Sequence, residues 1–164
     1  MANWNWDGML NENEEKLLKD LILYLYEGYS KFGHDKYAEH IFYMSVRDVT
    51  RIIGERKNLK ISKRAEEILG KCNDFKMVEK AQKENPRLTV NEHKIPAKNF
   101  WDEFKNKKAQ GKIFSKNDAE HWLDDAEIAI ITKEEDEKLT RSGWIKNRPD
   151  NAYEILGIEL KDVK

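Results

Sequence analysis

The sequence predicts a mainly α-helical fold with a small β-hairpin, an α+β architecture in which a helical body carries a ββα unit. Apolar residues recur at helical spacing through the first half, β-prone runs occur only in the second half, and several helix starts carry a capping pattern. The 164 residues are enough to bury one core without disulfides. We expect one compact domain made of a helical region, residues 1–85, and a ββα-like region with a C-terminal helix, residues 86–164.

The first region is expected to be helical throughout. Helices are predicted over residues 11–33, 34–44, 49–58, 63–72 and 74–85. Ser45 and Asp48 form a capping pattern that predicts a new helix start in the middle of the region, and Ser62 is the expected N-cap of the fourth helix. Gly33 and Pro86 mark the expected ends of the first and fifth helices.

The second region contains the two good strand candidates, "RLTVNEHKI" over residues 87–95 and "IAIIT" over residues 128–132. A lone strand would leave its backbone groups unpaired, so we expect these two to pair with each other. Helices are predicted over residues 96–112, 116–127, 133–143 and 150–157, the second and third of them capped by Ser115 and Thr132. The result is a hairpin with a long helical excursion, followed directly by a helix. No internal repeat is visible in the sequence.

Composition excludes several classes of protein. The N-terminus has no basic leader followed by an apolar run, and no stretch approaches the ~20 apolar residues of a membrane span. Cys72 is the single cysteine, which excludes an internal disulfide and a Cys-rich zinc site and fits a reducing compartment. We therefore expect a soluble, cytoplasmic protein without a membrane partner.

Charge is segregated along the chain although the net charge is only −1. Residues 46–64 and residues 94–116 each carry seven Lys or Arg against two Asp or Glu, which gives +5 for each segment. Residues 117–137 carry one Lys against nine Asp or Glu, which gives −8. The segments are either solvated helix faces of opposite sign, or a basic surface for phosphate beside an acidic site for a cation.

The stretch "RLTVNEHKIP" brings a carboxylate and an imidazole together at the end of a predicted strand. Glu92 and His93 are adjacent, and Pro96 stops the strand three residues later. Carboxylates and an imidazole are the groups that metal-assisted hydrolysis uses. If the two strands pair, the helix after the second strand can bring its acidic first turn, Glu135 and Asp136, near this pair.

These elements resemble the HNH, or ββα-metal, nucleases over about residues 87–143. In that family the first strand ends in an acidic residue or His, then His, and shortly afterwards a hydrophobic residue and Pro, which "EHKIP" matches. "IAIITKEEDEKL" is similar to the second strand and helix, with Asp136 where the family more often has His. The resemblance implies that Glu92 and Asp136, with Glu135 beside them, bind a divalent metal, Mg²⁺ or Mn²⁺, while His93 activates a water.

The resemblance also implies a metal-dependent endonuclease acting on nucleic acid, with DNA favoured. Such compact nucleases often belong to phage, restriction or other mobile-element systems. Basic residues around the site are candidates for phosphate contacts. These nucleic-acid-binding candidates are Lys94, Lys98, Arg141, Lys146 and Arg148.

Other chemical interpretations of the same residues remain open. Glu92 and Lys94 form an E-x-K pattern that resembles the PD-(D/E)xK nucleases, with Asp74 as the nearby upstream acid. In the plainest interpretation, Glu92 is a surface carboxylate and His93 is hydrogen-bonded at a strand end.

Two non-catalytic functions are also compatible with the sequence. An inhibitor or immunity-like protein could bind a basic protein partner through the acidic residues 117–137. A helical regulator could contact nucleic acid through Arg47, Arg51, Arg56 and Lys57.

Overall fold

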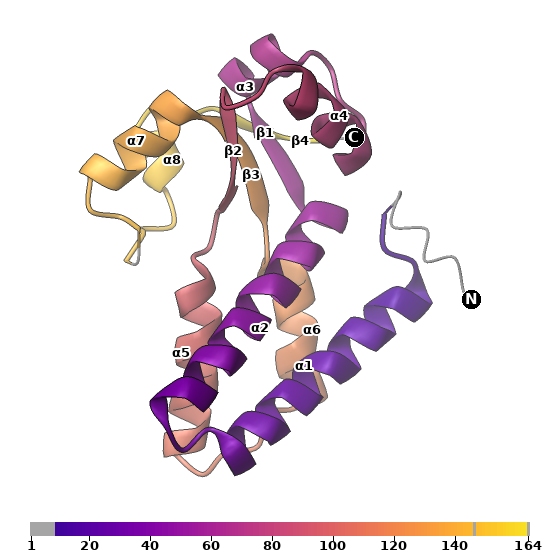
Figure 1. The fold of residues 1–164 in the computed structure, drawn as a ribbon, viewed down its shortest axis with the longest axis vertical. Helices are drawn as coiled ribbons and strands as arrows, with labels where there is room; N and C mark the ends of the chain where they lie inside the picture. The colour runs from indigo at the N-terminus through magenta and orange to yellow at the C-terminus, as the bar shows by residue number, and fades with distance from the viewer. Residues whose placement is uncertain (1–8, 146, 164) are drawn as a thin grey trace.

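The computed structural model describes residues 9–145 and 147–163. Long helices form a lower tier, and a small sheet flanked by shorter helices forms an upper tier (Figure 1). The helices of the described part are α1 (Glu12–Phe32), α2 (Lys36–Arg56), α3 (Lys63–Leu69), α4 (Phe75–Glu84), α5 (Ala97–Ala109), α6 (Lys116–Asp125), α7 (Lys133–Arg141) and α8 (Ala152–Ile155). Its strands are β1 (Leu59–Ser62), β2 (Thr89–His93), β3 (Ile128–Thr132) and β4 (Leu160–Asp162). The predicted class, mainly α with a small β part, is confirmed.

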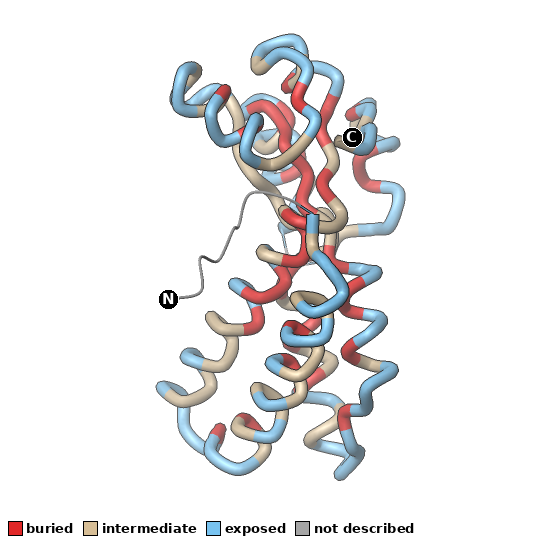
Figure 2. Tube along the Cα trace, turned by 90° about the vertical axis from the view of Figure 1, so that its right-hand side faces the viewer, coloured by how far each residue is buried: buried red, intermediate tan, exposed pale blue. Residues whose placement is uncertain are grey.

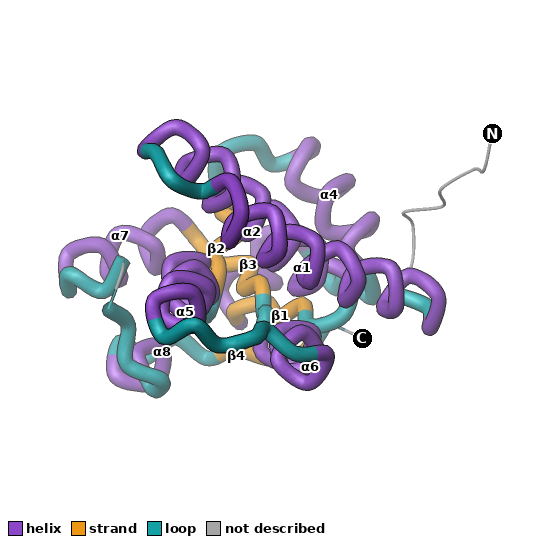
Figure 3. Tube along the Cα trace, turned by 90° about the horizontal axis from the view of Figure 1, so that it is seen from below, coloured by secondary structure: helices purple, strands orange, loops and turns teal. Residues whose placement is uncertain are grey.

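The lower tier joins helices from both halves of the chain. Seen from below, α1 and α2 lie on one side, and α5 and α6 on the other (Figure 3). Their inward faces share one aromatic core, in which the rings of Phe104 and Trp122 stack with centroids 4.7 Å apart. Tyr29 from α1 packs in the same core against Trp101 from α5, with centroids 4.7 Å apart. The two regions expected from the sequence therefore contribute to a common core. No helix among the described residues is long and apolar enough to span a membrane.

The predicted break in the middle of α2 is wrong, because α2 runs unbroken through Ser45. An N-cap residue must leave helical geometry to accept from the backbone ahead of it. Ser45 instead stays in the helix and donates its hydroxyl to the carbonyl of Ile41, one turn back, at 3.0 Å. Val46 and Val49, just beyond it, are both buried in the core. A continuous helix keeps that apolar face in contact with its neighbours, which outweighs the local capping pattern.

The sheet has four strands in the order β2-β3-β1-β4. The predicted pairing of β2 with β3 is confirmed and is antiparallel, with Thr89 opposite Thr132 and His93 opposite Ile128. The expectation that the other segments contain no strand is wrong, because β1 pairs parallel with β3, and β4 pairs antiparallel with β1. β1, Leu59–Ser62, alternates apolar and polar residues over only four positions, the shortest run that indicates a strand, and β4 has three residues.

β3 is buried on both faces of the sheet, as its uninterrupted apolar run predicts. Ile128 and Ile130 point to the face covered by α3 and α4, and Ala129 and Ile131 point to the face covered by α7 and α8. In Figure 2 the buried residues follow the strands and the inward sides of the helices, while the outer turns are exposed. β3 is therefore the strand on which both layers of helices pack.

Each of the two central strands directly follows a helix: α2 leads into β1, and α6 leads into β3. The side-chain amide of Asn58 joins the two helix ends by donating to the carbonyls of Leu123 at 2.8 Å and Ala126 at 3.0 Å. A Cβ atom at Gly54 would lie only 2.7 Å from the backbone nitrogen of Ile128. A glycine at this position therefore allows α2 to pass close against the start of β3.

The fold contains an internal repeat that the sequence does not reveal. The order α1-α2-β1-α3-α4-β2 recurs as α5-α6-β3-α7-α8-β4. Exchanging the two copies reproduces the strand order and every pairing type, parallel for β1 with β3 and antiparallel for the outer pairs. In each copy the second strand pairs with the first strand of the other copy. The copies are therefore interlocked, which joins the two halves of the chain in one sheet.

Candidate functional site

The end of β2 is held in place by a buried cation, Arg148, from the segment between α7 and α8. Its side chain is 3% exposed, and its Nη2 donates to Glu92 Oε1 at 2.7 Å. Nη1 donates to the carbonyl of His93 at 2.7 Å and to the hydroxyl of Tyr153 at 3.0 Å, while Nε donates to the carbonyl of Trp144 at 3.1 Å. One guanidinium thus ties β2 to α8 and to the segment after α7 through charge-assisted hydrogen bonds.

Two of the predicted metal ligands, Glu92 and Asp136, lie within electrostatic reach of each other. Burial raises the pKa of Asp136, the negative charge of Glu92 raises it further, and Arg148 lowers it. The cation that acts on both carboxylates is therefore the guanidinium of Arg148. In residues 9–145 and 147–163 no group of three or more His, Cys, Asp or Glu side chains is placed to hold a metal ion. The structure shows one oxygen of Glu92, Oε1, accepting from Arg148, so a cation of the protein itself already neutralises this carboxylate.

The third predicted metal ligand, Glu135, lies at the other end of the hairpin. The antiparallel register places Thr132, which precedes α7, opposite the start of β2, whereas His93 is at its end. Glu135 is 3% exposed, and its Oε2 accepts from the Ser62 hydroxyl at 2.6 Å and from the Thr132 backbone at 2.9 Å. The structure therefore places Glu135 in a capping box that also links β3 to β1.

The predicted base, His93, has a largely buried imidazole beside α2. Its Nε2 lies 3.5 Å from Thr50 Oγ1, and the ring hydrogen-bonds to the backbone of Arg47. Burial lowers the pKa of His93, and nearby positive charges lower it further, against an opposing effect of that backbone hydrogen bond; these charges belong to Arg51, Arg47 and Arg148. The imidazole is therefore neutral at neutral pH.

Glu92 and His93 line the sheet end of a groove between α2 and α5, with a volume of about 480 Å³. α2 contributes Tyr43 and Arg47 to one wall, and Ile145, after α7, also lines the groove. The lining residues from the start of α5 and the turn before it are Pro96, Ala97, Lys98, Trp101, Asp102 and Lys105. A concavity of this size is within the range of small-ligand sites.

Ion pairs with lysines and arginines neutralise six of the nine carboxylates of the acidic segment, residues 117–137. The pairs to the basic segments are Lys57–Asp124 at 3.6 Å, Lys60–Glu127 at 3.9 Å, Arg64–Glu134 at 3.8 Å, Lys94–Glu127 at 2.9 Å and Lys107–Asp118 at 2.6 Å. Two more pairs are Lys19–Glu120 at 2.7 Å and Arg141–Glu137 at 3.0 Å. The charge that is segregated in the sequence is thus matched across the fold.

The groove keeps positive charge that this pairing leaves over. Arg47 pairs at 3.5 Å with its own neighbour, Asp48, and its side chain is 44% exposed. Lys105 is exposed and forms no ion pair with any residue of the described part. Lys98, by contrast, pairs with Asp102 along α5. The groove is lined by three cations, Arg47, Lys98 and Lys105, against two carboxylates, Glu92 and Asp102, so its lining carries one net positive charge.

The predicted phosphate-binding residues are dispersed over the fold. Lys98 lines the groove, Lys94 pairs with Glu127, and Arg141 lies on the exposed face of α7. Arg148 is internal, and Lys146 lies outside the described residues.

The residues of the alternative hypotheses are dispersed too. Asp74, the upstream acid of the E-x-K pattern, accepts from the backbone of Met77 as the N-cap of α4. Among the four basic residues of the regulator hypothesis, Arg47 lines the groove and Arg56 is buried. Lys57 binds Glu15 at 3.1 Å beside its pair with the acidic segment.

Tyr43, Trp101 and Lys105 are groove residues that the sequence analysis did not select. Trp101 and Lys105 are four positions apart on α5, as Tyr43 and Arg47 are on α2, so each pair shares one side of its helix. For each helix alone, that spacing indicates in the sequence that the two residues lie on the same side. Nothing local in the sequence indicates that α2 would lie beside α5.

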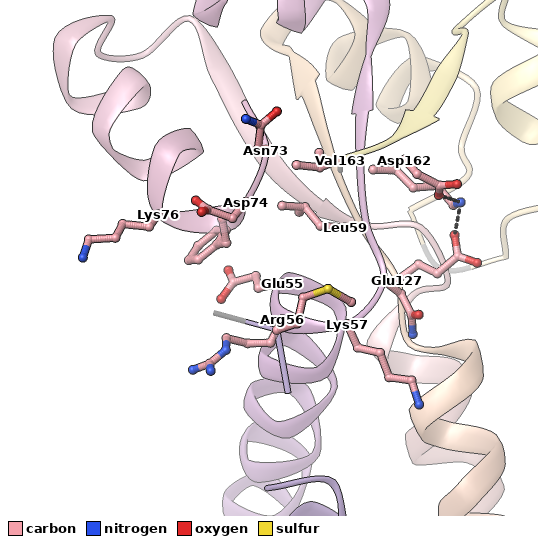
Figure 4. A pocket seen from close by; sticks show the side chains of 14 residues that line it. Glu55, Arg56, Lys57, Leu59, Asn73, Asp74, Lys76, Glu127, Asp162 and Val163 are labelled. Atoms are coloured by element: carbon pink, nitrogen blue, oxygen red, sulfur yellow. Dashed lines mark hydrogen bonds and ion pairs between the residues drawn. The ribbon is translucent and has the colours of Figure 1, made fainter. Parts of the chain in front are cut away.

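A second cavity, of about 640 Å³, lies between the end of α2, the start of α4 and strands β1 and β4 (Figure 4). Its floor includes Leu59, Phe75 and Val163. Charges of both signs surround that floor, as in the ion pairs of Lys60 with Asp162 at 2.7 Å and with Glu127. This cavity lacks the excess of positive charge that distinguishes the groove.

Comparison with protein-family models, with curated proteins and with solved structures finds no match to this chain. The functional argument therefore comes from the geometry of the groove.

Removal of Arg148 tests its role in holding the end of β2. We expect Arg148→Met to lower the free energy of unfolding by about 3 kcal/mol, because two carbonyls and a half-buried carboxylate lose a buried charged donor. Glu92→Gln should cost only about 1 kcal/mol, since its amide oxygen can still accept from Arg148. Urea denaturation measures both, with the exposed Arg141→Met as a control that should change stability by less than ~0.5 kcal/mol. Equal effects of Arg148→Met and Arg141→Met would contradict the assignment.

The lowered pKa of His93 predicts a pH-dependent stability. In the folded state the imidazole binds a proton less readily than in the unfolded state, so the unfolded state gains protons first as the pH falls. Wild-type stability should therefore decline as the pH falls below about 6.5, the ordinary pKa of His. Thermal unfolding across this window should decline less steeply for His93→Gln, and His34→Gln, at an exposed position, should behave as wild type. A wild-type slope in His93→Gln would show that the buried imidazole is not the group responsible.

Proposed function

We propose that the protein binds nucleic acid, with the groove between α2 and α5 as the site of contact. The observation that carries the proposal is that Arg47 and Lys105 place a cation on each of the two facing walls of one groove. A phosphate backbone is the biological polyanion that such a charged groove fits. The neutral imidazole of His93 adds a hydrogen-bonding group to the same groove, and the carboxylates of Glu92 and Asp102 are paired with Arg148 and Lys98.

The pairing of the acidic segment weighs against the inhibitor hypothesis. Six of the nine acidic side chains of residues 117–137 form the ion pairs described above, and Glu135 is buried. A basic partner protein would have to compete with these internal cations for the same carboxylates. Arg47 and Lys105 of the groove, in contrast, form no ion pair with the acidic segment. Nucleic acid would not have to compete with that segment for them.

Hydrolysis of the bound nucleic acid is a second candidate function, and the position of His93 favours it. A general base must be unprotonated at the working pH and must reach the reacting group. His93 meets the first condition through its lowered pKa, and it lines the groove. The role of Glu92 in this proposal is to position β2 through Arg148, and we propose no metal ion between Glu92 and Asp136.

Substitutions that remove positive charge from the groove test the binding proposal. The double variant Arg47→Gln, Lys105→Gln should bind a fluorescent oligonucleotide about tenfold more weakly, and the slope of log affinity against log salt should fall by about one for each lost phosphate contact. The matched control is Lys63→Gln, Lys116→Gln, which removes two exposed lysines of the same basic segments outside the groove. Fluorescence anisotropy over a salt series measures both quantities. Equal losses in the two double variants would indicate diffuse attraction to basic segments and would overturn the proposal.

A cleavage assay separates the two candidate functions. If His93 is a base, wild type should cleave single-stranded or duplex substrates, and His93→Gln should lose at least about a hundredfold in rate while keeping its affinity. Parallel reactions with Mg²⁺, with Mn²⁺ and with a chelator define any metal requirement. Cleavage by His93→Gln at the wild-type rate would remove His93 from the chemistry. Binding without cleavage under all conditions would leave binding alone as the function.

A further inference from the structure

We infer that the groove takes an unpaired nucleotide, so that the protein prefers single-stranded nucleic acid to duplex. This inference rests on the proposed function and specifies its substrate class. It comes from the order of aromatic and cationic side chains along the groove and from the enclosure of the groove by three elements.

The first observation is an aromatic side chain between the two cations. Tyr43 is half-buried on α2, and its ring meets that of Trp101 from α5 edge to face, with centroids 6.0 Å apart. Trp101 is 8% exposed and so supports Tyr43 from behind. The ring of Tyr43 is therefore held by packing while part of it lines the groove, which suits the stacking of a base.

The second observation is the order in which charged and aromatic side chains follow one another from the open end of the groove to the sheet. α2 approaches the sheet as residue numbers rise, and α5 leaves it, because α5 starts just after β2 (Figure 1). His93 contacts Thr50, so Arg47 lies between the sheet end and Tyr43, about 6 Å along the helix from Tyr43. Lys105, one turn beyond Trp101 on α5, lies on the far side of the aromatic pair. The order is therefore cation, aromatic ring, cation.

This order matches one nucleotide with its two flanking phosphates. A base on Tyr43 would place one phosphate toward Arg47 and the other toward Lys105. Bases in a duplex are stacked on each other and paired, so their faces cannot reach an aromatic side chain without being extruded. Proteins that bind single strands combine positive grooves with aromatic platforms in this way.

The third observation is the shape of the groove at its sheet end. Glu92, His93 and Pro96 line that end, and Ile145 from the segment tied down by Arg148 borders the same space. A phosphate backbone on the outside of a duplex needs only an open positive surface. A concavity with an apolar border and a few polar groups is typical of sites that enclose a planar ligand.

Binding of matched probes tests the inference. The probes are a short single-stranded oligonucleotide, the duplex that it forms with its complement, and inorganic polyphosphate, each competed against a labelled single strand. Wild type should bind the single strand at least about tenfold more tightly than the duplex, and polyphosphate should compete weakly. Tyr43→Leu should lose about tenfold in affinity for the single strand, and Tyr43→Phe should retain wild-type affinity, because stacking needs the ring and not the hydroxyl.

The control variant is Tyr37→Leu, which changes a tyrosine on the same helix that is 85% exposed and outside the groove. It should bind as wild type. Because the comparison of single strand with duplex uses the wild-type protein, it holds even if Tyr43→Leu is poorly folded, which thermal unfolding would reveal. Equal binding of single strand, duplex and polyphosphate, with no effect of Tyr43→Leu, would overturn the inference while leaving nucleic-acid binding intact. Absence of binding to every probe would overturn the proposed function itself.

Discussion

The candidate site depends on one interaction, the buried guanidinium of Arg148. Its nitrogens donate to the carboxylate of Glu92, the carbonyl of His93 and the hydroxyl of Tyr153. A single side chain therefore joins the end of β2 both to α8 and to the segment that follows α7. A buried arginine is stable only when its donors are satisfied, and here each nitrogen has a partner. The same contacts hold the backbone of β2 where Glu92 and His93 line the sheet end of the groove. Of the residues that resemble a metal site, Glu92 is paired with Arg148, and burial raises the pKa of Asp136 against the lowering effect of the same positive charge.

The positive charge of the groove follows from the way that the segregated charges of the chain come together. Residues 46–64 and 94–116 flank the acidic residues 117–137 in the fold, and their lysines and arginines pair with its carboxylates. Surface pairs of this kind contribute little stability individually, but they decide where charge remains. Arg47 and Lys105 form no ion pair with the acidic segment, and together they place a cation on each wall of the groove. The second cavity, beneath β1 and β4, is lined by equal numbers of positive and negative side chains.

Much of the fold could be predicted from the sequence, because its local signals agree with its tertiary contacts. Ser62, Ser115 and Thr132 all cap the helices that they were predicted to start, and the apolar run of β3 marks a strand buried on both faces. Two features depend on long-range contacts and could not be predicted. The short strands β1 and β4 exist because the interlocked repeat supplies their partners. The adjacency of α2 and α5 brings Tyr43 and Arg47 to the predicted Glu92–His93 pair, and the direction of pairing places Glu135 at the wrong end for a shared site with His93.

The most direct test of the account is a map of the backbone amides that respond to nucleic acid in solution. A titration of the ¹⁵N-labelled protein with a short single-stranded oligonucleotide, followed by two-dimensional NMR, would provide it. The account predicts that the largest shift changes lie on α2 around Tyr43 and Arg47, on α5 from Lys98 to Lys105, and at His93. Shift changes confined to the acidic residues 117–137, or to the cavity beneath β1 and β4, would contradict the assignment of the groove as the binding site.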